Sequence, residues 1–166
     1  MALALRQLIP PLTARTPTGK LIHAWAFKQK KNLVIAFFHS GCQRCEKFLG
    51  ALAAHAVELA EQEAVALIVF PAVPPAFLTE NLPPEIIFAA DLTGRAQRAY
   101  LGLEAFGPVG QQCVGVFITD RYGELYAQWV GATEDALPGL RDVFGWLEQI
   151  EFACEECGAS HWPAAS

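Results

Sequence analysis

The sequence predicts an α/β protein built on a central mixed β-sheet flanked by helices. Residues Leu33 to Phe38 form an uninterrupted apolar run rich in strand-forming residues, as expected for a strand that is covered on both faces. Apolar residues at helical spacing follow this run almost directly. Later in the chain, two apolar runs flank a short turn that contains Gly123, which indicates an antiparallel hairpin.

The other elements are predicted in chain order from the same patterns. An N-terminal strand or hairpin is expected around Leu21 to Trp25, after a turn-prone segment, and a helix is expected from Cys42 to Leu59. The remaining expectations are a strand at Ala64 to Phe70, a proline-rich connection at Pro71 to Pro84, a short strand at Ile86 to Ala89, a small helix ending at Tyr100, a loop at Gly102 to Gly110, and hairpin strands at Val114 to Thr119 and Glu124 to Val130.

The last predicted helix runs from about Asp135 to Glu151. Its apolar positions fall on one face: Leu137, Leu140, Val143, Phe144, Leu147 and Ile150. The residues beyond this helix hold a second Cys-x-x-Cys pair and lie outside the predicted sheet and helices. We therefore expect one domain over residues 1–151 and a C-terminal Cys-x-x-Cys tail over residues 152–166 that is not an independent domain.

The composition excludes several classes of protein. A chain of 166 residues with 53% hydrophobic and 17% charged residues is expected to form a compact core. A net charge of -5 without any basic stripe argues against a nucleic-acid partner. The most apolar run, Ala64 to Phe70, is far shorter than the roughly 20 residues that span a bilayer, and no signal peptide is recognised. We therefore expect a soluble, cytoplasmic protein without a membrane partner.

The first Cys-x-x-Cys pair, Cys42 and Cys45, stands where the predicted central strand turns into a helix. A thiol attacks a disulfide as the thiolate, and an ordinary cysteine with a pKa near 8.5 is mostly protonated at neutral pH. A helix N-terminus favours the thiolate of Cys42, and Arg44 adds a nearby cation. Cys45 is expected to be more buried and to resolve the mixed disulfide. The alternative is a pair of cysteines that merely pack as small apolar side chains.

The residues around this pair resemble the redoxin group, which comprises thioredoxins and the peroxiredoxin-like alkyl hydroperoxide reductase/thiol-specific antioxidant family. The matching segments are Asn32 to Leu49, Phe88 to Gly94, Ala99 to Gly102 and Val116 to Gly123. The resemblance implies a thioredoxin-like fold over roughly residues 5–150. It also implies redox chemistry at Cys42 and Cys45 without a cofactor.

The sequence departs from that group where its members keep helper residues. Peroxidase members place a proline and a threonine or serine before the peroxidatic cysteine, and here those positions are Ile35 and His39. Val114 stands where thioredoxins have a cis-proline and peroxiredoxins an arginine, and Ala36 replaces the buried aspartate of thioredoxins. The resemblance therefore implies the fold more firmly than either mechanism.

Two further residues are candidate auxiliaries of the pair. Cys113 precedes the position of the cis-proline, which in this fold faces the two cysteines, so it is predicted to lie near Cys42 and to offer a third thiol. The alternative is a buried cysteine at the start of a strand. His39 is a candidate for tuning Cys42 or for accepting a proton, and the alternative is an ordinary loop histidine.

The second pair, Cys154 and Cys157, allows three interpretations. In a redox relay, Glu155 and Glu156 would disfavour thiolates and make this dithiol the more reducing pair, so that electrons pass from the tail to Cys42 and Cys45. As a zinc knuckle, the pair would gain a third ligand in His161 but lack a fourth. The third interpretation is an inert tail.

Three functions follow as hypotheses. The first is a thiol-disulfide oxidoreductase or redox-relay protein that uses Cys42 and Cys45. The second is a peroxiredoxin-like thiol peroxidase with Cys42 as the peroxidatic cysteine, and the third is a noncatalytic binding module with a zinc-binding tail. The expected partners are protein or small-molecule disulfides or hydroperoxides and a thiol electron donor. The oligomeric state is left open.

Overall fold

The sheet of this computed structural model has seven strands in the order β2-β1-β5-β4-β3-β6-β7. The structure describes residues 3–74, 76–102 and 113–165, with side chains up to residue 152. The strands are β1 (Thr13–Arg15), β2 (Leu21–His23), β3 (Asn32–Phe37), β4 (Ala64–Phe70), β5 (Ile86–Ala90), β6 (Val114–Thr119) and β7 (Leu125–Gly131). The helices are η1 (Ala24–Phe27), α1 (Gln43–Ala54), α2 (Ala56–Glu61), α3 (Ala76–Thr79), α4 (Arg95–Leu101), η4 (Glu134–Ala136) and α5 (Leu140–Ala165).

The apolar run Leu33 to Phe38 supplies the central strand, as predicted. Strand β3 pairs in parallel with β4 and antiparallel with β6, and every residue of β3 is buried. Strand β5 extends the parallel part beyond β4, and β6 and β7 form the predicted antiparallel hairpin. The mixed sheet flanked by helices confirms the predicted α/β class.

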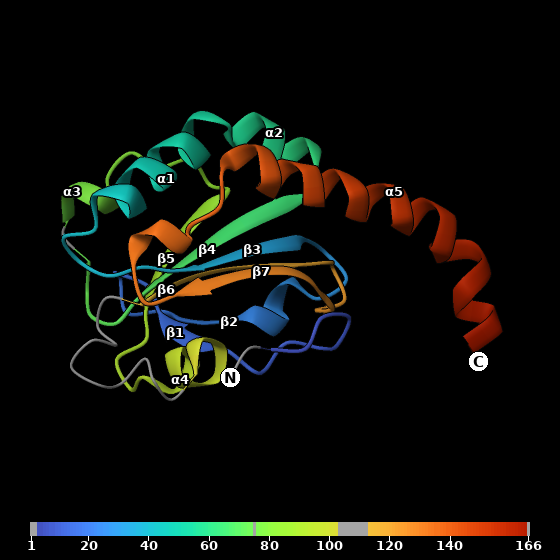
Figure 1. Cartoon of the computed structure of the whole chain (residues 1–166), viewed down its shortest axis with the longest axis horizontal. Coiled ribbons are helices and arrows are strands. Elements are labelled where there is room, and N and C mark those ends of the chain that lie inside the picture. Colours follow the sequence, from blue (N-terminus) through green and yellow to red (C-terminus); the bar gives the residue numbers. More distant parts are fainter. Residues whose placement is uncertain (1–2, 75, 103–112, 166) are drawn as a thin grey trace.

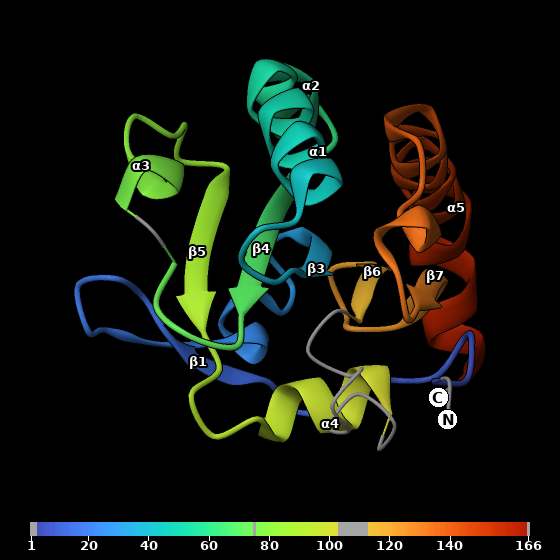
Figure 2. The ribbon, with the colours of Figure 1, turned by 60° about the vertical axis from the view of Figure 1, so that its left-hand side comes forward.

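Helices cover both faces of the sheet (Figures 1 and 2). Because side chains alternate along a strand, Val34 and Ala36 point to the face covered by α1, α2 and α5, whereas Leu33 and Ile35 point to the opposite face. That opposite face is covered by α4 and by the N-terminal segment. Each face has its own apolar core, and Cys42 and Cys45 belong to the core under α1 and α5.

Two predicted elements are shorter than expected. The predicted helix from Cys42 to Leu59 is divided at His55 into α1 and α2, and both the backbone N–H and Nδ1 of His55 lie at hydrogen-bond distance from the Ala51 carbonyl. The predicted strand through Trp25 ends at His23, where the chain turns into η1. The predicted loop after Gly102 lies mostly outside the described residues.

Both predicted ends of the last helix are wrong. Helix α5 begins at Leu140 because Pro138 holds the preceding Leu137 in an extended conformation, and only the short η4 forms before it. Helix α5 then continues to Ala165 instead of ending at Glu151, because residues 152–157 include no glycine or proline, and the helix also runs on through Gly158 and Pro163. The backbone of the predicted tail is thus a continuation of α5, which extends beyond the sheet (Figure 1). None of the helices in the described part of the chain is long and apolar enough to cross a membrane.

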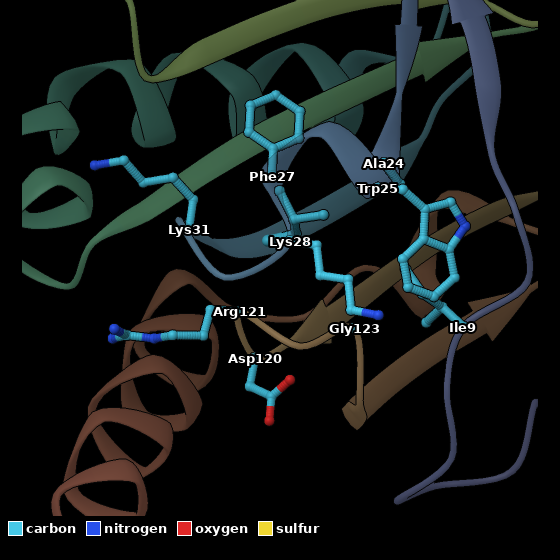
Figure 3. Close-up of a pocket in the computed structure, with 10 residues that line it drawn as sticks. Ile9, Ala24, Trp25, Phe27, Lys28, Lys31, Asp120, Arg121 and Gly123 are labelled. Atoms are coloured by element: carbon cyan, nitrogen blue, oxygen red, sulfur yellow. The ribbon is translucent and has the colours of Figure 1, made fainter. Parts of the chain in front are cut away.

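The turn between β6 and β7 contains a buried carboxylate, Asp120, which is 4% exposed. It lies beside Arg121 and Gly123 in a small cavity bounded by the η1 segment (Figure 3). Its Oδ1 accepts hydrogen bonds from the backbone N–H groups of Tyr122 and Glu124, at 2.9 and 3.0 Å. Burial raises the pKa of Asp120, although these two hydrogen bonds act in the opposite direction.

This raised pKa predicts a pH-dependent effect of Asp120→Asn. Between the unfolded and the higher folded pKa, the folded chain binds more protons, so the wild-type free energy of unfolding falls as pH rises through this window. Asparagine accepts the same backbone hydrogen bonds without a charge. We expect the stability of the variant relative to wild type to be greater near pH 7 than near pH 4 in urea unfolding. A difference that does not change with pH would contradict the prediction.

Candidate functional site

The candidate site begins where β3 ends and α1 starts. Ser40 and Gly41 form the turn between these elements, and Gly41 has a φ of +78°, a left-handed conformation that glycine adopts without steric cost. This turn places Cys42 at the N-cap of α1 and Cys45 one turn into the helix. The first Cys-x-x-Cys pair therefore stands at a strand-to-helix junction, as the sequence predicts.

Cys42 and Cys45 are joined by a disulfide, and their Cα atoms are 5.2 Å apart. Such a separation is within the usual range for disulfides. The expected difference in burial between the two residues is not found, since Cys42 is 1% and Cys45 is 2% exposed. A substrate sulfur therefore reaches the sulfur of Cys42 or Cys45 only after a side chain that covers it moves.

The Cys42 sulfur receives opposing electrostatic influences. As the N-cap atom, its Sγ accepts the backbone N–H of Cys45 at 3.1 Å, an interaction that stabilises negative charge on sulfur. Glu134 from η4 lies on the same sulfur, with its Oε2 3.3 Å from Sγ, and a carboxylate there opposes a thiolate. The same Oε2 accepts the backbone N–H of Arg44 at 3.4 Å. Glu134 and Cys42 thus each accept a hydrogen bond from a backbone N–H group at the N-terminus of α1.

The guanidinium of Arg44 is directed to a second acidic residue of the same turn. Its Nη1 lies 2.7 Å from Oδ1 of Asp135, in an ion pair that is largely exposed. The sequence predicts Arg44 as a cation beside Cys42, but its charge is shared with Asp135 and its effect on the sulfur is reduced accordingly. The contacts of Glu134 and Asp135 together tie η4 to the start of α1.

Glu134 is the site residue that sequence reasoning missed. It is 92 residues from Cys42 in the chain, and no local motif marks it. Its position depends on how closely η4 folds back on β7, since a Cβ added at Gly131 would lie 2.5 Å from the Cβ of Ala136. One usable signal was the pair of acidic residues directly after the last strand, because that strand lies in the same sheet as the strand before Cys42.

His39 and Cys113 lie in different places relative to the pair. A ring nitrogen of His39 and the sulfurs of Cys42 and Cys45 all lie within 4.8 Å of one another, so His39 belongs to the site. Cys113 packs against the core on the opposite face of the sheet, whereas the cysteine pair belongs to the core under α1 and α5. The structure therefore does not bring Cys113 to Cys42 as the sequence reasoning expected.

Apart from His39, the positions where the redoxin group keeps helper residues are apolar here and fully buried. Ala36 lies in the centre of β3, Val114 begins β6, and both belong to the core that includes the cysteine pair. Ile35 points to the other core. None of these three side chains can hold a proton or a peroxide, so Glu134 and His39 are the ionisable groups that the described residues place within reach of the sulfurs.

The second Cys-x-x-Cys pair, Cys154 and Cys157, lies in the C-terminal part of α5. The side chains of Cys154, Cys157 and His161 lie outside the described residues. Their backbone continues α5, and a helix rises about 1.5 Å per residue, so Cys154 is roughly 20 Å along the axis from Leu140, where α5 starts beside η4. The relay, zinc and inert interpretations of the tail therefore stay predictions.

Two cavities border α1, and one of them is lined by a cysteine of the pair. One, of about 120 Å³, is lined by His39, Gly41 and Cys45 together with apolar side chains that include Phe77 of α3. The other, of about 250 Å³, lies between α1 and the start of α5 and is lined by Arg44, Lys47 and apolar residues. The surroundings of the site are thus mainly apolar, with positive charge on the side of α1 that faces α5.

The comparisons with known proteins agree on the fold. A mitochondrial 2-Cys peroxiredoxin from Plasmodium falciparum matches with a TM-score of 0.68 at 14% identity, covering 95% of this chain and 99% of that chain. A putative thiol:disulfide interchange protein DsbE from Chlorobium tepidum matches with a TM-score of 0.64 at 17% identity, covering 92% and 98%. A reduced Plasmodium vivax 2-Cys peroxiredoxin matches with a TM-score of 0.67 at 13% identity, covering 91% and 98%.

These similarities show that the chain has a thioredoxin-like fold over nearly its whole length, as the sequence resemblance implies. The sequence itself matches no protein-family model and no curated protein. At 13 to 17% identity the similar structures establish the architecture, and the assignment of an activity depends on the site.

Proposed function

We propose that the chain is a thiol-disulfide oxidoreductase that cycles between a Cys42/Cys45 dithiol and the Cys42–Cys45 disulfide. The observation that carries the proposal is the disulfide at the N-terminus of α1, where Sγ of Cys42 accepts the Cys45 backbone N–H. A helix N-terminus stabilises the thiolate that the reaction needs. A structural disulfide would not need its first sulfur at an N-cap position.

The proposed cycle transfers two electrons. The Cys42 thiolate attacks a substrate disulfide, forms a mixed disulfide and releases one substrate thiolate, which takes up a proton. The Cys45 thiolate then attacks Sγ of Cys42, releases the second substrate thiol and leaves the Cys42–Cys45 disulfide. A dithiol donor reduces this disulfide again and is itself oxidised to a disulfide. The tail pair Cys154/Cys157 is a candidate for that donor role, acting within the chain or on a second copy.

Access to Cys42 requires a movement at η4. Because Cys42 is buried and the Glu134 carboxylate lies on its sulfur, the Glu134 side chain must turn away before a substrate sulfur can approach in line. Glu134 is half-buried, and its contacts with the Cys42 sulfur and the Arg44 backbone N–H are made by its side-chain Oε2, so a rotation of this side chain removes both. Substrates are expected to be protein or small-molecule disulfides that can fit against the apolar surroundings of the pair.

A peroxidase function has less support from the site. Two of the similar structures are 2-Cys peroxiredoxins, which keeps peroxides among the substrates to be tested. However, Ile35 and Val114 are fully buried apolar residues and offer no hydrogen bond to a peroxide. We therefore place disulfide exchange before peroxide reduction.

The test is a comparison of two activities of the full chain. Dithiothreitol serves as the electron donor, and reduction of insulin disulfides is followed beside consumption of hydrogen peroxide. We expect the protein to accelerate insulin reduction above the rate of dithiothreitol alone and to leave peroxide consumption unchanged. Faster peroxide consumption without insulin reduction would replace the proposal by a thiol peroxidase. Neither activity, together with bound zinc in the tail, would indicate a binding module.

A further inference from the structure

We propose that the reduced site binds a zinc ion through His39, Cys42 and Cys45, and that formation of the disulfide abolishes this binding. One ring nitrogen and the two sulfurs lie within 4.8 Å of one another. A nitrogen and two thiolates are ligands that Zn²⁺ prefers, and three protein ligands leave a fourth position for water. The proposal shares with the proposed function only the requirement that the Cys42–Cys45 disulfide can be reduced.

The hydrogen bond of His39 supports a ligand role. Its Nδ1 lies 3.0 Å from the carbonyl oxygen of Ser40. Because a carbonyl oxygen only accepts, Nδ1 carries the hydrogen in this bond and Nε2 is left with its lone pair. Histidines that bind metals usually donate their other ring N–H to a carbonyl or carboxylate in this way, which fixes the tautomer and the ring orientation.

The cavity beside the site offers an entry path for an ion. His39 and Cys45 both line the cavity of about 120 Å³, and His39 is half-exposed while the two sulfurs are buried. Glu46 lines the same cavity, and its negative charge attracts a cation toward it. An ion that enters from the side of His39 therefore meets Cys45 in the cavity wall, and the buried Cys42 sulfur lies within 4.8 Å of the same His39 nitrogen.

Disulfide formation controls this site. Binding of Zn²⁺ to the dithiol releases the two thiol protons. When a substrate disulfide takes two electrons from the two thiolates, the Cys42–Cys45 bond forms, the substrate S–S bond breaks, and the substrate leaves as two thiolates that take up protons from water. The zinc ion thereby loses two of its three protein ligands. Bound zinc thus protects the reduced pair, and oxidation releases it.

The experiment uses the full-length chain with Cys154→Ser and Cys157→Ser, so that the tail pair does not contribute. The protein is reduced with a phosphine, the thiols are counted, and Zn²⁺ binding is measured by competition with a chromophoric chelator. We expect one zinc per chain in the reduced form and none in the oxidised form. His39→Gln should weaken binding by about 10-fold or more. His23→Gln serves as the matched control, since His23 bonds to Thr13 on the β1–β2 hairpin, and it should leave binding unchanged.

The outcomes separate this inference from the proposed function. Zinc binding that is equally tight in His39→Gln would overturn the three-residue site, because the dithiol alone would then account for it. A reduced chain, verified by its thiol count, that binds no zinc would also overturn it while leaving disulfide exchange intact. Zinc binding by a chain without insulin-reducing activity would reject only the proposed function. A thiolate-to-metal charge-transfer band with Co²⁺ that loses intensity in Cys42→Ser identifies the sulfur ligand.

Discussion

Cys42→Ser is expected to abolish disulfide exchange, with a loss of roughly 10³-fold or more in turnover, because serine offers no thiolate to attack a disulfide. Cys45→Ser is expected to stop turnover at a different step. Its Cys42 still attacks the substrate but is not released, so a mixed disulfide accumulates and appears in mass spectra as a chain with the substrate attached. Cys42→Ser should show no such adduct at this site.

Cys113→Ser is the matched control for both variants. Cys113 packs against the opposite core, so its replacement should leave turnover close to that of the wild type. An adduct trapped by Cys42→Ser at Cys45 would reverse the assigned roles, since Cys45 would then be the attacking thiol. Wild-type turnover in Cys42→Ser would reject the pair as the redox centre.

The central part of the sheet was predictable because short segments of the sequence carry the patterns that specify it. Leu33 to Phe38 had to be covered on both faces, and the turn at Gly123 had to join antiparallel strands, whatever the rest of the chain does. The start of the last helix was less predictable. The apolar repeat from Leu137 onward is genuinely helical, but the geometry that Pro138 imposes on Leu137 overrides the first turn of this repeat.

The site was predictable only where it is local in sequence. The positions of Cys42 and Cys45 follow from one strand-to-helix junction. Glu134, by contrast, belongs to η4, which follows the β6–β7 hairpin, and it contacts the Cys42 sulfur across 92 residues of sequence. The misplacement of Cys113 has a simple cause. Consecutive residues of an extended chain point to opposite faces, so a Val114 that faces the core of the pair directs the preceding residue to the other core.

The position of Glu134 on the Cys42 sulfur has a measurable electrostatic consequence. A carboxylate 3.3 Å from the sulfur disfavours the thiolate and thereby the reduced state of the pair. In Glu134→Gln, the shape is kept and the negative charge is removed, so the reduced state is favoured. If the pKa of the Cys42 thiol falls by one unit and stays above neutral pH, the thiolate fraction at neutral pH rises about tenfold, whereas the reduction potential rises by up to roughly 30 mV only at a pH above both pKa values.

We therefore expect Glu134→Gln to react about tenfold faster with iodoacetamide at neutral pH and to have a less negative reduction potential in glutathione redox buffers, both measured with a chelator present. Asp135→Asn is the control of equal charge change, because Asp135 pairs with the Arg44 guanidinium and not with the sulfur, and its effect should be much smaller. Equal effects of both variants would mean that net charge, not contact, is responsible. Slower alkylation in Glu134→Gln would show instead that the Glu134 carboxylate accepts the Cys42 proton.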